Sequence, residues 1–376
     1  MITIRPGSHV YKLLQLLSTA GEIPANALQL IGNERVLSVL VHKLESVQDF
    51  RYRTRSEVYR TKLLQVSGKK GLRTIRLYKG ALPILNNLHP FASEYYMKAF
   101  WNHRLPGDRQ HIGRNHRVAE ALALCMAAGV EIRPYALPAL QKNIIRQTVP
   151  NSPRFYIARD FKKIGGDDTN KTAFTRITGA LFCQGNVFAV YNTQNAIMKW
   201  SGLCEIKTVG NLLELARMNA GLDTVNAALL LGKSGEVALN TVLESDKSRK
   251  PDLRFDRIYS RIHFIPLDQN GVRLLKILIL PDWNEKLLTA LFEPDQRSYN
   301  KGAMEYDGIV DGRKILSYLD GDIARLIRFR EAQNYQTEPA DVICFPWQTS
   351  FLKSYLNGLA GLRELNMDAV EAALRQ

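Results

Sequence analysis

The sequence predicts a protein of the α/β class (α+β overall), in which a small unit of helices and a β-hairpin precedes a larger mixed-sheet α/β domain. Apolar residues recur at helical spacing through residues 8–47, and two strand-like runs surround a pair of glycines in residues 58–79. Beyond residue 174, strand-like and helix-like runs alternate, as in layered α/β domains. The length of 376 residues suits two or three domains. We place their limits at residues 1–100, 101–150 and 151–376.

Positive charge is concentrated in the first two-fifths of the chain, which has a net charge of +15. Residues 1–150 hold 22 Lys and Arg against 9 Asp and Glu, a balance of +13, whereas the remaining residues hold 29 against 27, a balance of +2. A basic module joined to a near-neutral one favours a nucleic-acid-binding part and a separate part with another role. The alternative is a basic surface kept for solubility, although solubility alone does not require this asymmetry.

The N-terminal pattern predicts three helices joined by tight turns. The first helix begins after Ser8, a candidate N-cap, and ends at Gly21. Residues 22–32 predict a short turn and a second helix of about two turns. Asn33 can cap a third helix over residues 34–47. Helices of this length and connection match a helix-turn-helix core.

The predicted third helix has an apolar stripe on one side and polar residues on the other. We expect the stripe to pack inward and the polar side to face solvent. The stripe consists of Val36, Leu37, Leu40, Val41, Leu44 and Val47. The polar side carries Arg35, Ser38 and His42, with Lys43 beside them.

Two strand-like runs, 58–66 and 72–79, predict a β-hairpin after the third helix. Gly68 and Gly71 can take the positive φ angles that a tight hairpin loop needs. Three helices followed by a strand, a loop and a strand is the element order of a winged helix-turn-helix. In that arrangement the third helix enters the major groove, while the hairpin lies along the phosphate backbone.

The candidate DNA-binding residues fall into two groups. Side chains of the third helix can contact base edges, which gives sequence preference. Basic side chains of the hairpin, of its approach and of a later helix can contact phosphates, which gives affinity without preference. The first group is Arg35, Ser38 and His42 with Lys43 nearby, and the second is Lys69, Lys70 and Arg73 with Arg51, Arg53, Arg55, Arg114 and Arg117.

A basic helix is predicted over residues 115–128, with Asn115 as its N-cap. His103, His111 and His116 lie around its start, but their spacings match no standard helical pair of metal ligands. We therefore expect no metal and no cofactor. The four cysteines are far apart and form no C-x-x-C pair, so neither a disulfide framework nor a cysteine-based zinc site is expected.

A polar stretch with two prolines, residues 147–154, predicts a linker before the second domain. The pattern beyond it predicts a mixed sheet with helices on its faces. Strands are expected at 174–185, 186–194, 204–208, 261–268, 272–280 and 341–347, and helices at 209–220, 234–245, 284–292 and 349–359.

Glu205 and Lys207 form an E-x-K pair at the end of an expected strand. In some nucleases such a pair completes a site where carboxylates hold a divalent ion and the lysine steadies the nucleophile. The preceding strand should supply another acidic residue, but it offers amides such as Asn192. The triplet 232–234 (Gly-Lys-Ser) is like the end of a phosphate-binding loop, yet Ala227 occupies the place of the leading glycine. We therefore expect a protein without catalysis, with a metal-dependent DNA nuclease as the alternative.

The domain order resembles that of replication-relaxation proteins, which are winged-helix DNA-binding proteins of bacterial plasmids and other mobile elements. The resemblance rests on the helix and hairpin pattern of residues 8–79 and on the basic helix GRNHRVAEALALCMAAG, residues 113–129. It implies an N-terminal winged helix joined to a restriction-endonuclease-like α/β domain, which in that family often lacks a full catalytic set.

We therefore expect a sequence-preferring protein that binds double-stranded DNA and acts in replication, mobilisation or control of a plasmid or integrative element. The alternatives are a metal-dependent nuclease using Glu205 and Lys207, a transcription regulator whose α/β domain senses a ligand, and a protein-interaction scaffold. A second copy of the chain and other mobile-element proteins are further candidate partners. The sequence has no signal-like N-terminus and no apolar run of the roughly 18–20 residues that span a bilayer, so we expect a cytoplasmic location and no membrane partner.

Overall fold

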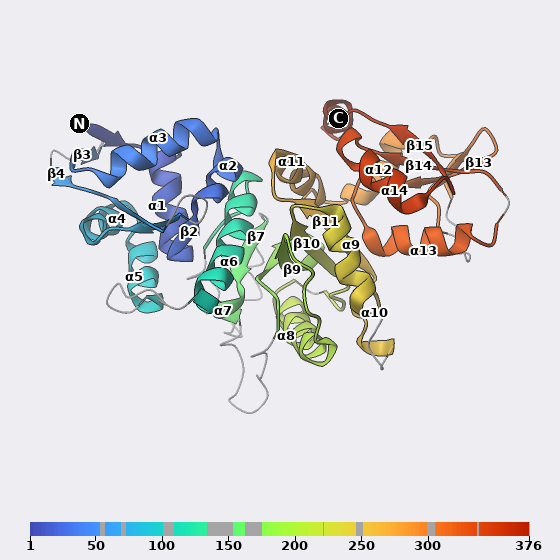
Figure 1. Ribbon diagram of the computed structural model, residues 1–376, viewed down its shortest axis with the longest axis horizontal. Coiled ribbons are helices and arrows are strands. Elements are labelled where there is room, and N and C mark those ends of the chain that lie inside the picture. Colours follow the sequence, from blue (N-terminus) through green and yellow to red (C-terminus); the bar gives the residue numbers. More distant parts are fainter. Residues whose placement is uncertain are drawn as a thin grey trace.

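Helices and strands are mixed throughout the computed structural model, so the expected α+β class is confirmed. Figure 1 shows the N-terminal elements at one end of the long axis, a five-stranded sheet near the middle and a four-stranded sheet at the other end. The structure describes residues 1–52, 57–68, 73–100, 109–133, 153–161, 175–220, 222–245, 251–298, 305–336 and 338–375.

The N-terminal unit combines three helices with a three-stranded antiparallel sheet of order β2-β6-β5. Ser8 caps the first helix by accepting a hydrogen bond from the Tyr11 amide at 3.3 Å, and Gly21 ends that helix at φ 79°, as predicted. In chain order the elements are α1 (His9–Ala20), β2 (Glu22–Pro24), α2 (Leu28–Ile31), α3 (Glu34–Glu45), β5 (Leu64–Ser67) and β6 (Thr74–Leu77).

A second small sheet, of order β1-β3-β4, lies beside this unit and was not predicted. Its strands are β1 (Ile2–Ile4), β3 (Gln48–Tyr52) and β4 (Val58–Thr61). The single strand expected over 58–66 is therefore wrong, because its first part pairs with β3 and only β5 joins the hairpin. The break falls at Leu63, whose side chain is buried and whose amide donates to the Leu44 carbonyl at 2.9 Å.

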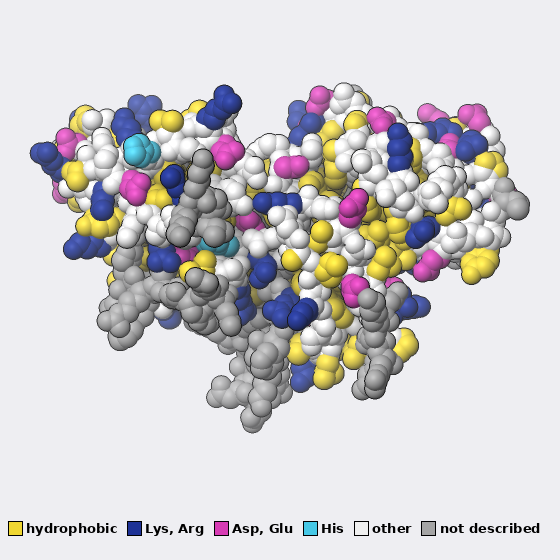
Figure 2. All heavy atoms as spheres, in the orientation of Figure 1, with side chains coloured by type: hydrophobic (Ala, Val, Ile, Leu, Met, Phe, Trp, Pro, Cys, Tyr) yellow, Lys and Arg dark blue, Asp and Glu magenta, His cyan; other side chains and the backbone are white. Residues whose placement is uncertain are grey.

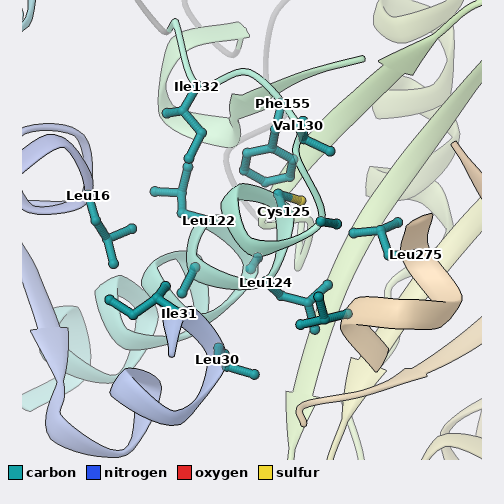
Figure 3. Packing of buried hydrophobic residues seen from close by; sticks show 14 of the residues in the cluster. Leu16, Leu30, Ile31, Leu122, Leu124, Cys125, Val130, Ile132, Phe155 and Leu275 are labelled. Atoms are coloured by element: carbon teal, nitrogen blue, oxygen red, sulfur yellow. The ribbon is translucent and has the colours of Figure 1, made fainter. Parts of the chain in front are cut away.

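Helix α6 (Arg109–Ala127) lies between the N-terminal unit and the central sheet, after the helices α4 (Leu82–Leu88) and α5 (Pro90–Ala99). Figure 3 shows its buried side chains Leu122 and Cys125 among residues of the N-terminal helices on one side and of the central sheet and α11 on the other. Asn115 was expected to cap this helix, which is wrong. The helix begins six residues earlier, and the Asn115 amide instead donates to Glu22.

The central sheet has the order β11-β10-β9-β8-β7. Three strands of this sheet form an antiparallel meander. They are β7 (Arg154–Ile157), β8 (Gly179–Cys183) and β9 (Asn186–Gln194), in chain order. Strands β10 (Ala227–Gly232) and β11 (Arg261–Pro266) continue the sheet parallel to β9. One face packs on α6 and α11 (Gln269–Leu278), while the other packs on α8 (Gly202–Ala220), α9 (Gly235–Glu244) and α10 (Phe255–Ile258). The short helix α7 (Ala158–Phe161) follows β7.

Two segments expected as strands are helical. Residues 204–208 lie in α8, where Glu205, Thr208 and Leu212 are buried at helical spacing. Residues 272–280 lie largely in α11, where Asp268 caps the helix by accepting a hydrogen bond from the Gly271 amide at 3.1 Å. Both predictions were wrong because a short apolar run does not by itself distinguish a buried strand from a buried helix.

The C-terminal sheet has the order β12-β13-β14-β15, with three neighbouring parallel strands after an antiparallel first pair. The strands are β12 (Gly308–Val310), β13 (Arg313–Ser317), β14 (Ala340–Cys344) and β15 (Gly361–Glu364), and the helices are α12 (Trp283–Leu291), α13 (Ile323–Gln333), α14 (Thr349–Leu356) and α15 (Met367–Ala373). The helices expected at 234–245, 284–292 and 349–359 are confirmed as α9, α12 and α14. Within the described ranges, no helix combines the length and the apolar character needed to cross a membrane.

Candidate nucleic-acid interface

Helix α3 presents one face to solvent and packs its other face on the N-terminal core. Asn33 caps the helix, because its Oδ1 accepts hydrogen bonds from the amides of Arg35 at 3.1 Å and Val36 at 3.2 Å. The side chains of Leu37, Val41 and Leu44 are buried. The exposed face carries Arg35, Ser38, His42 and Lys43, together with Val36 and Val39, which are 53% and 71% exposed.

Two valines that were expected in the apolar stripe of α3 lie outside it. Val36 is exposed because one residue along a helix rotates the side chain by about 100° from buried Leu37. Val47 is 60% exposed because the helix ends at Glu45 and Val47 follows it. The inward stripe is therefore narrower than predicted, and the exposed face is partly apolar.

The β5–β6 hairpin is joined to the C-terminal end of α3. The Glu45 carboxylate accepts a hydrogen bond from the Val66 amide at 3.2 Å. Gly68 has φ 96°, as the hairpin prediction required, and Arg73 is exposed where β6 begins. Lys69 and Lys70 lie outside the described residues. Of the three predicted hairpin cations, Arg73 is the one that the structure places, and it lies at the loop end of the hairpin.

The cations before the hairpin belong to a different sheet. Arg51 is exposed on β3, in the sheet of order β1-β3-β4, while Arg53 and Arg55 lie outside the described residues. Figure 2 shows Lys, Arg and His side chains over the N-terminal elements, interspersed with hydrophobic and acidic ones. On this face, the basic side chains of the described N-terminal residues are spread over a broad area and are mixed with acidic ones.

A second basic group lies where α6 meets the central sheet. Arg114 is exposed and Arg117 is half-buried on α6, and Arg176 is exposed just before β8. Partial desolvation and the nearby positive charge of Arg176 lower the pKa of Arg114. Figure 2 also shows Lys and Arg side chains near the middle of this face. Arg114 and Arg176 come from distant parts of the sequence, so the fold brings their charges together.

Polar contacts fix α6 against the β2-β6-β5 sheet. Glu22 on β2 is fully buried, and its carboxylate accepts hydrogen bonds from Arg76 Nε and from Asn115 Nδ2, both at 2.9 Å. His116 Nε2 lies 3.2 Å from the Thr74 hydroxyl. Burial lowers the pKa of His116, the Glu22 carboxylate opposes this effect and the Arg76 guanidinium adds to it. These contacts set the position of the N-terminal sheet relative to α6.

Glu205 and Lys207 do not form a site together. Glu205 is buried on α8, where its carboxylate accepts hydrogen bonds from the Tyr191 hydroxyl at 2.6 Å and from the Arg176 amide at 2.9 Å. Lys207, two residues further along the helix, is exposed. Two positions along a helix are about 200° apart, so the two side chains point away from each other. The expected strand-end pair is wrong, and the geometry does not support its use in cleavage.

A polar cluster that was not predicted from the sequence lies at the end of β9. The carboxylate of buried Glu120 on α6 accepts hydrogen bonds from Asn192 Nδ2 at 2.9 Å and Gln194 Nε2 at 2.8 Å. The pairing of β9 with β10 is irregular here, and Gln194 has φ 54°. The amides of β9 were noted in the sequence, but their partner lies 72 residues before Asn192. Glu120 is thus paired with amides, whereas a nuclease metal site needs several carboxylates.

The Gly-Lys-Ser triplet has an ordinary structural role. Gly232 ends β10, Lys233 is exposed, and the Ser234 hydroxyl caps α9 by accepting a hydrogen bond from the Val237 amide at 3.4 Å.

In comparisons with known proteins, no family model, curated protein or solved structure matches the chain.

Proposed function

We propose that the chain is a sequence-preferring protein that binds double-stranded DNA, and that residues 9–77 act as its winged helix-turn-helix. The observation that carries this proposal is the exposed polar and basic face of α3, joined to an antiparallel hairpin whose loop end carries Arg73. In this mode α3 enters the major groove, whose width admits a helix, and the hairpin lies along the adjacent phosphates.

The exposed face of α3 offers two kinds of contact with base edges. Arg35 can donate two hydrogen bonds to guanine, and Ser38 and His42 can donate or accept at either base pair. Val36 and Val39 offer methyl groups, which suit the methyl group of thymine. A mixture of donors and exposed methyl groups on one helix favours discrimination between sequences over charge attraction alone.

Phosphate contacts are assigned to the cations outside the α3 face. Arg73 lies at the hairpin, Lys43 near the C-terminal end of α3, and Arg114 and Arg117 on α6. Such contacts raise affinity for every sequence and weaken as salt concentration rises. The Glu205 carboxylate is engaged by Tyr191 and Arg176 within the protein, which favours a structural role for it over the nuclease alternative.

Fluorescence anisotropy on a labelled duplex, selected from a random pool by the protein itself, tests the proposal. The logarithm of affinity should fall linearly with the logarithm of salt concentration, with a slope near −0.9 for each phosphate contact. Arg73→Ala should weaken all sequences alike and make the slope shallower by about 0.9. Arg35→Ala should cost about 1–3 kcal/mol on the selected duplex and little on others.

The matched control is Lys353→Ala, which removes an exposed cation from α14 in the C-terminal part. It should leave affinity and slope unchanged. A flat salt response of the wild-type protein, or equal effects of the Arg73 and Lys353 variants, would contradict the proposed interface.

We place this activity in the replication, mobilisation or control of a bacterial mobile element. This setting rests on the resemblance of the domain order to that of replication-relaxation proteins. The duplex enriched from a random pool should then occur in the replicon that carries the coding sequence, close to its origin or control regions. A selected sequence scattered over unrelated chromosomal DNA would contradict this setting while leaving the DNA-binding proposal intact.

A further inference from the structure

Three buried side chains of metal-ligand type meet between the central and C-terminal sheets. His263 lies on β11, and Asp320 and Asp322 lie in the turn between β13 and α13. None of the three is more than 4% exposed. One ring nitrogen of His263 and one carboxylate oxygen of each aspartate lie within 4.8 Å of one another. In the described part of the chain, no other group of three His, Cys, Asp or Glu side chains meets this condition.

The turn that carries the two aspartates is fixed against the edge of β11. The Gly321 carbonyl accepts a hydrogen bond from the Phe264 amide at 2.8 Å, and Gly321 has φ 68°. A Cβ at this position would lie 2.8 Å from the Phe264 carbonyl oxygen, so only glycine allows both the turn and the close approach. Asp322 Oδ1 accepts a hydrogen bond from the Ile262 amide at 3.0 Å, which ties the carboxylate itself to β11.

The buried charges around this cluster do not balance. Asp307 is a third buried aspartate nearby, and the guanidinium of Arg325 donates to it at 2.8 Å and to Glu305 at 3.1 Å. Glu305 also receives Arg328 Nε at 2.6 Å. Three buried aspartates thus face one buried guanidinium, so the buried carboxyl groups outnumber the buried guanidinium groups here. Uncompensated buried charge is costly, so a cation of charge +2 would stabilise this arrangement.

Two buried atoms of the cluster are left without a hydrogen-bond partner among the described residues. These atoms are His263 Nε2 and Asp322 Oδ2. His263 Nδ1 lies 3.1 Å from the Asp320 carbonyl oxygen and 3.6 Å from the Asp320 carboxylate, and donation to that carbonyl leaves the lone pair on Nε2. Histidines that bind metals commonly donate their other ring N–H in this way. The rings of Phe188 and Trp283 pack edge-on against the imidazole, which is fully buried.

We propose that His263, Asp320 and Asp322 form a binding site for one divalent transition-metal cation, of which Zn²⁺ is the closest match. An imidazole nitrogen with two carboxylate oxygens suits Zn²⁺ or Mn²⁺, whereas Mg²⁺ and Ca²⁺ are held by oxygen ligands. Because the ligands come from β11 and from the β13–α13 turn, the cation would join the central sheet to the C-terminal sheet. Its role is structural, since the cluster is closed to solvent.

Metal content and thermal unfolding of the full-length protein test the proposal. After purification and dialysis, elemental analysis should find about one Zn²⁺ per chain, because a closed site with three protein ligands exchanges slowly. Treatment with a chelator should lower the melting temperature, and added Zn²⁺ should restore it while Mg²⁺ should not, since a ligand that binds only the folded state stabilises it. No bound metal and no Zn²⁺-dependent shift would overturn the proposal.

Matched variants separate ligation from general stability. Asp322→Asn keeps the shape of the side chain and the oxygen that caps α13, but removes the negative charge, so it should lose both the bound metal and the Zn²⁺-dependent shift. Asp307→Asn removes a buried negative charge outside the ligand set and should keep both, even if its melting temperature is lower. Equal loss of metal in the two variants would overturn the assignment of ligands.

The visible absorption of bound Co²⁺ tests the ligands independently of the melting temperature. Co²⁺ in place of Zn²⁺ should give visible absorption bands of a low-coordinate site in the wild-type protein, with a shifted band in His263→Cys, where a thiolate replaces the imidazole. A spectrum identical to that of free Co²⁺ in the folded wild-type protein would contradict the site.

Discussion

The carboxylate of Glu205 receives hydrogen bonds from the Tyr191 hydroxyl and from the Arg176 amide, and the Tyr191 hydroxyl lies 2.8 Å from that of Tyr259. Burial, helped by Tyr259 and Glu205, raises the pKa of Tyr191 well above its ordinary value, so the phenol stays protonated and can donate to Glu205. The residue that the sequence marks as a candidate catalyst is therefore part of the packing between α8, β9 and α10.

Glu205→Ala should lower the free energy of unfolding by roughly 3 kcal/mol, because it removes the carboxylate that accepts hydrogen bonds from the buried Tyr191 hydroxyl and from the Arg176 amide, and because it opens a cavity. Lys207→Ala, on the exposed side of the same helix, should change it by less than about 0.5 kcal/mol. Urea unfolding followed by circular dichroism measures both. A Glu205→Ala protein of unchanged stability that loses a magnesium-dependent cleavage activity would restore the nuclease alternative.

His116 should make the fold sensitive to acid. Its pKa in the folded state is lowered from 6.5 by burial, so below that pH the unfolded chain binds a proton more readily than the folded protein does. The free energy of unfolding should therefore fall as the pH drops through and below 6.5, and be fully retained above it.

Urea unfolding at a series of pH values should show a smaller acid-induced loss in His116→Gln, which keeps a hydrogen-bonding group near Thr74 but cannot titrate. If the wild-type and variant proteins lose the same stability on acidification, His116 does not carry this dependence, and the other buried titratable groups do.

At the scale of elements, the helices of the N-terminal unit could be predicted because a single apolar face and clear caps define them. Ser8, Gly21 and Asn33 all act as their residue types suggested. The same reasoning failed for α11, where the run VRLLKILIL is apolar enough for a strand. The signal that marks the helix is Asp268, an N-cap three residues before Gly271. The strand expected at 261–268 included this residue as its last position.

The buried side of helix α6 should be sensitive to loss of side-chain volume. Leu122 is fully buried where the N-terminal helices meet α6, so Leu122→Ala should destabilise the protein by about 2–5 kcal/mol. Arg114→Ala on the exposed side of the same helix should cost less than about 0.5 kcal/mol. Thermal and urea unfolding measure the stability of both variants. Equal stabilities of the Leu122 and Arg114 variants would contradict the expected difference between the two sides of the helix.

At the scale of the whole molecule, the sequence predicted the α+β class but not the partners of each sheet. Local spacing says nothing of which strands pair, so the division between a five-stranded and a four-stranded sheet was missed. The two polar clusters were missed for the same reason. Glu120 and Asn192 are 72 residues apart, and His263 and Asp320 are 57 apart. Only folding brings such residues together.

The continuous core through α6 also bears on how such a protein can evolve. Buried residues of α1, of α6 and of the central sheet belong to one hydrophobic cluster. Leu16, Leu30 and Ile31 are buried and lie beside α6 (Figure 3), so a chain cut before α6 would lack the apolar surface next to these side chains. We therefore expect that residues 9–77, the segment proposed to bind DNA, are not stable when they are moved alone into another protein. A recombinant protein that contains this segment must also contain α6, or another apolar surface that covers the same buried side chains.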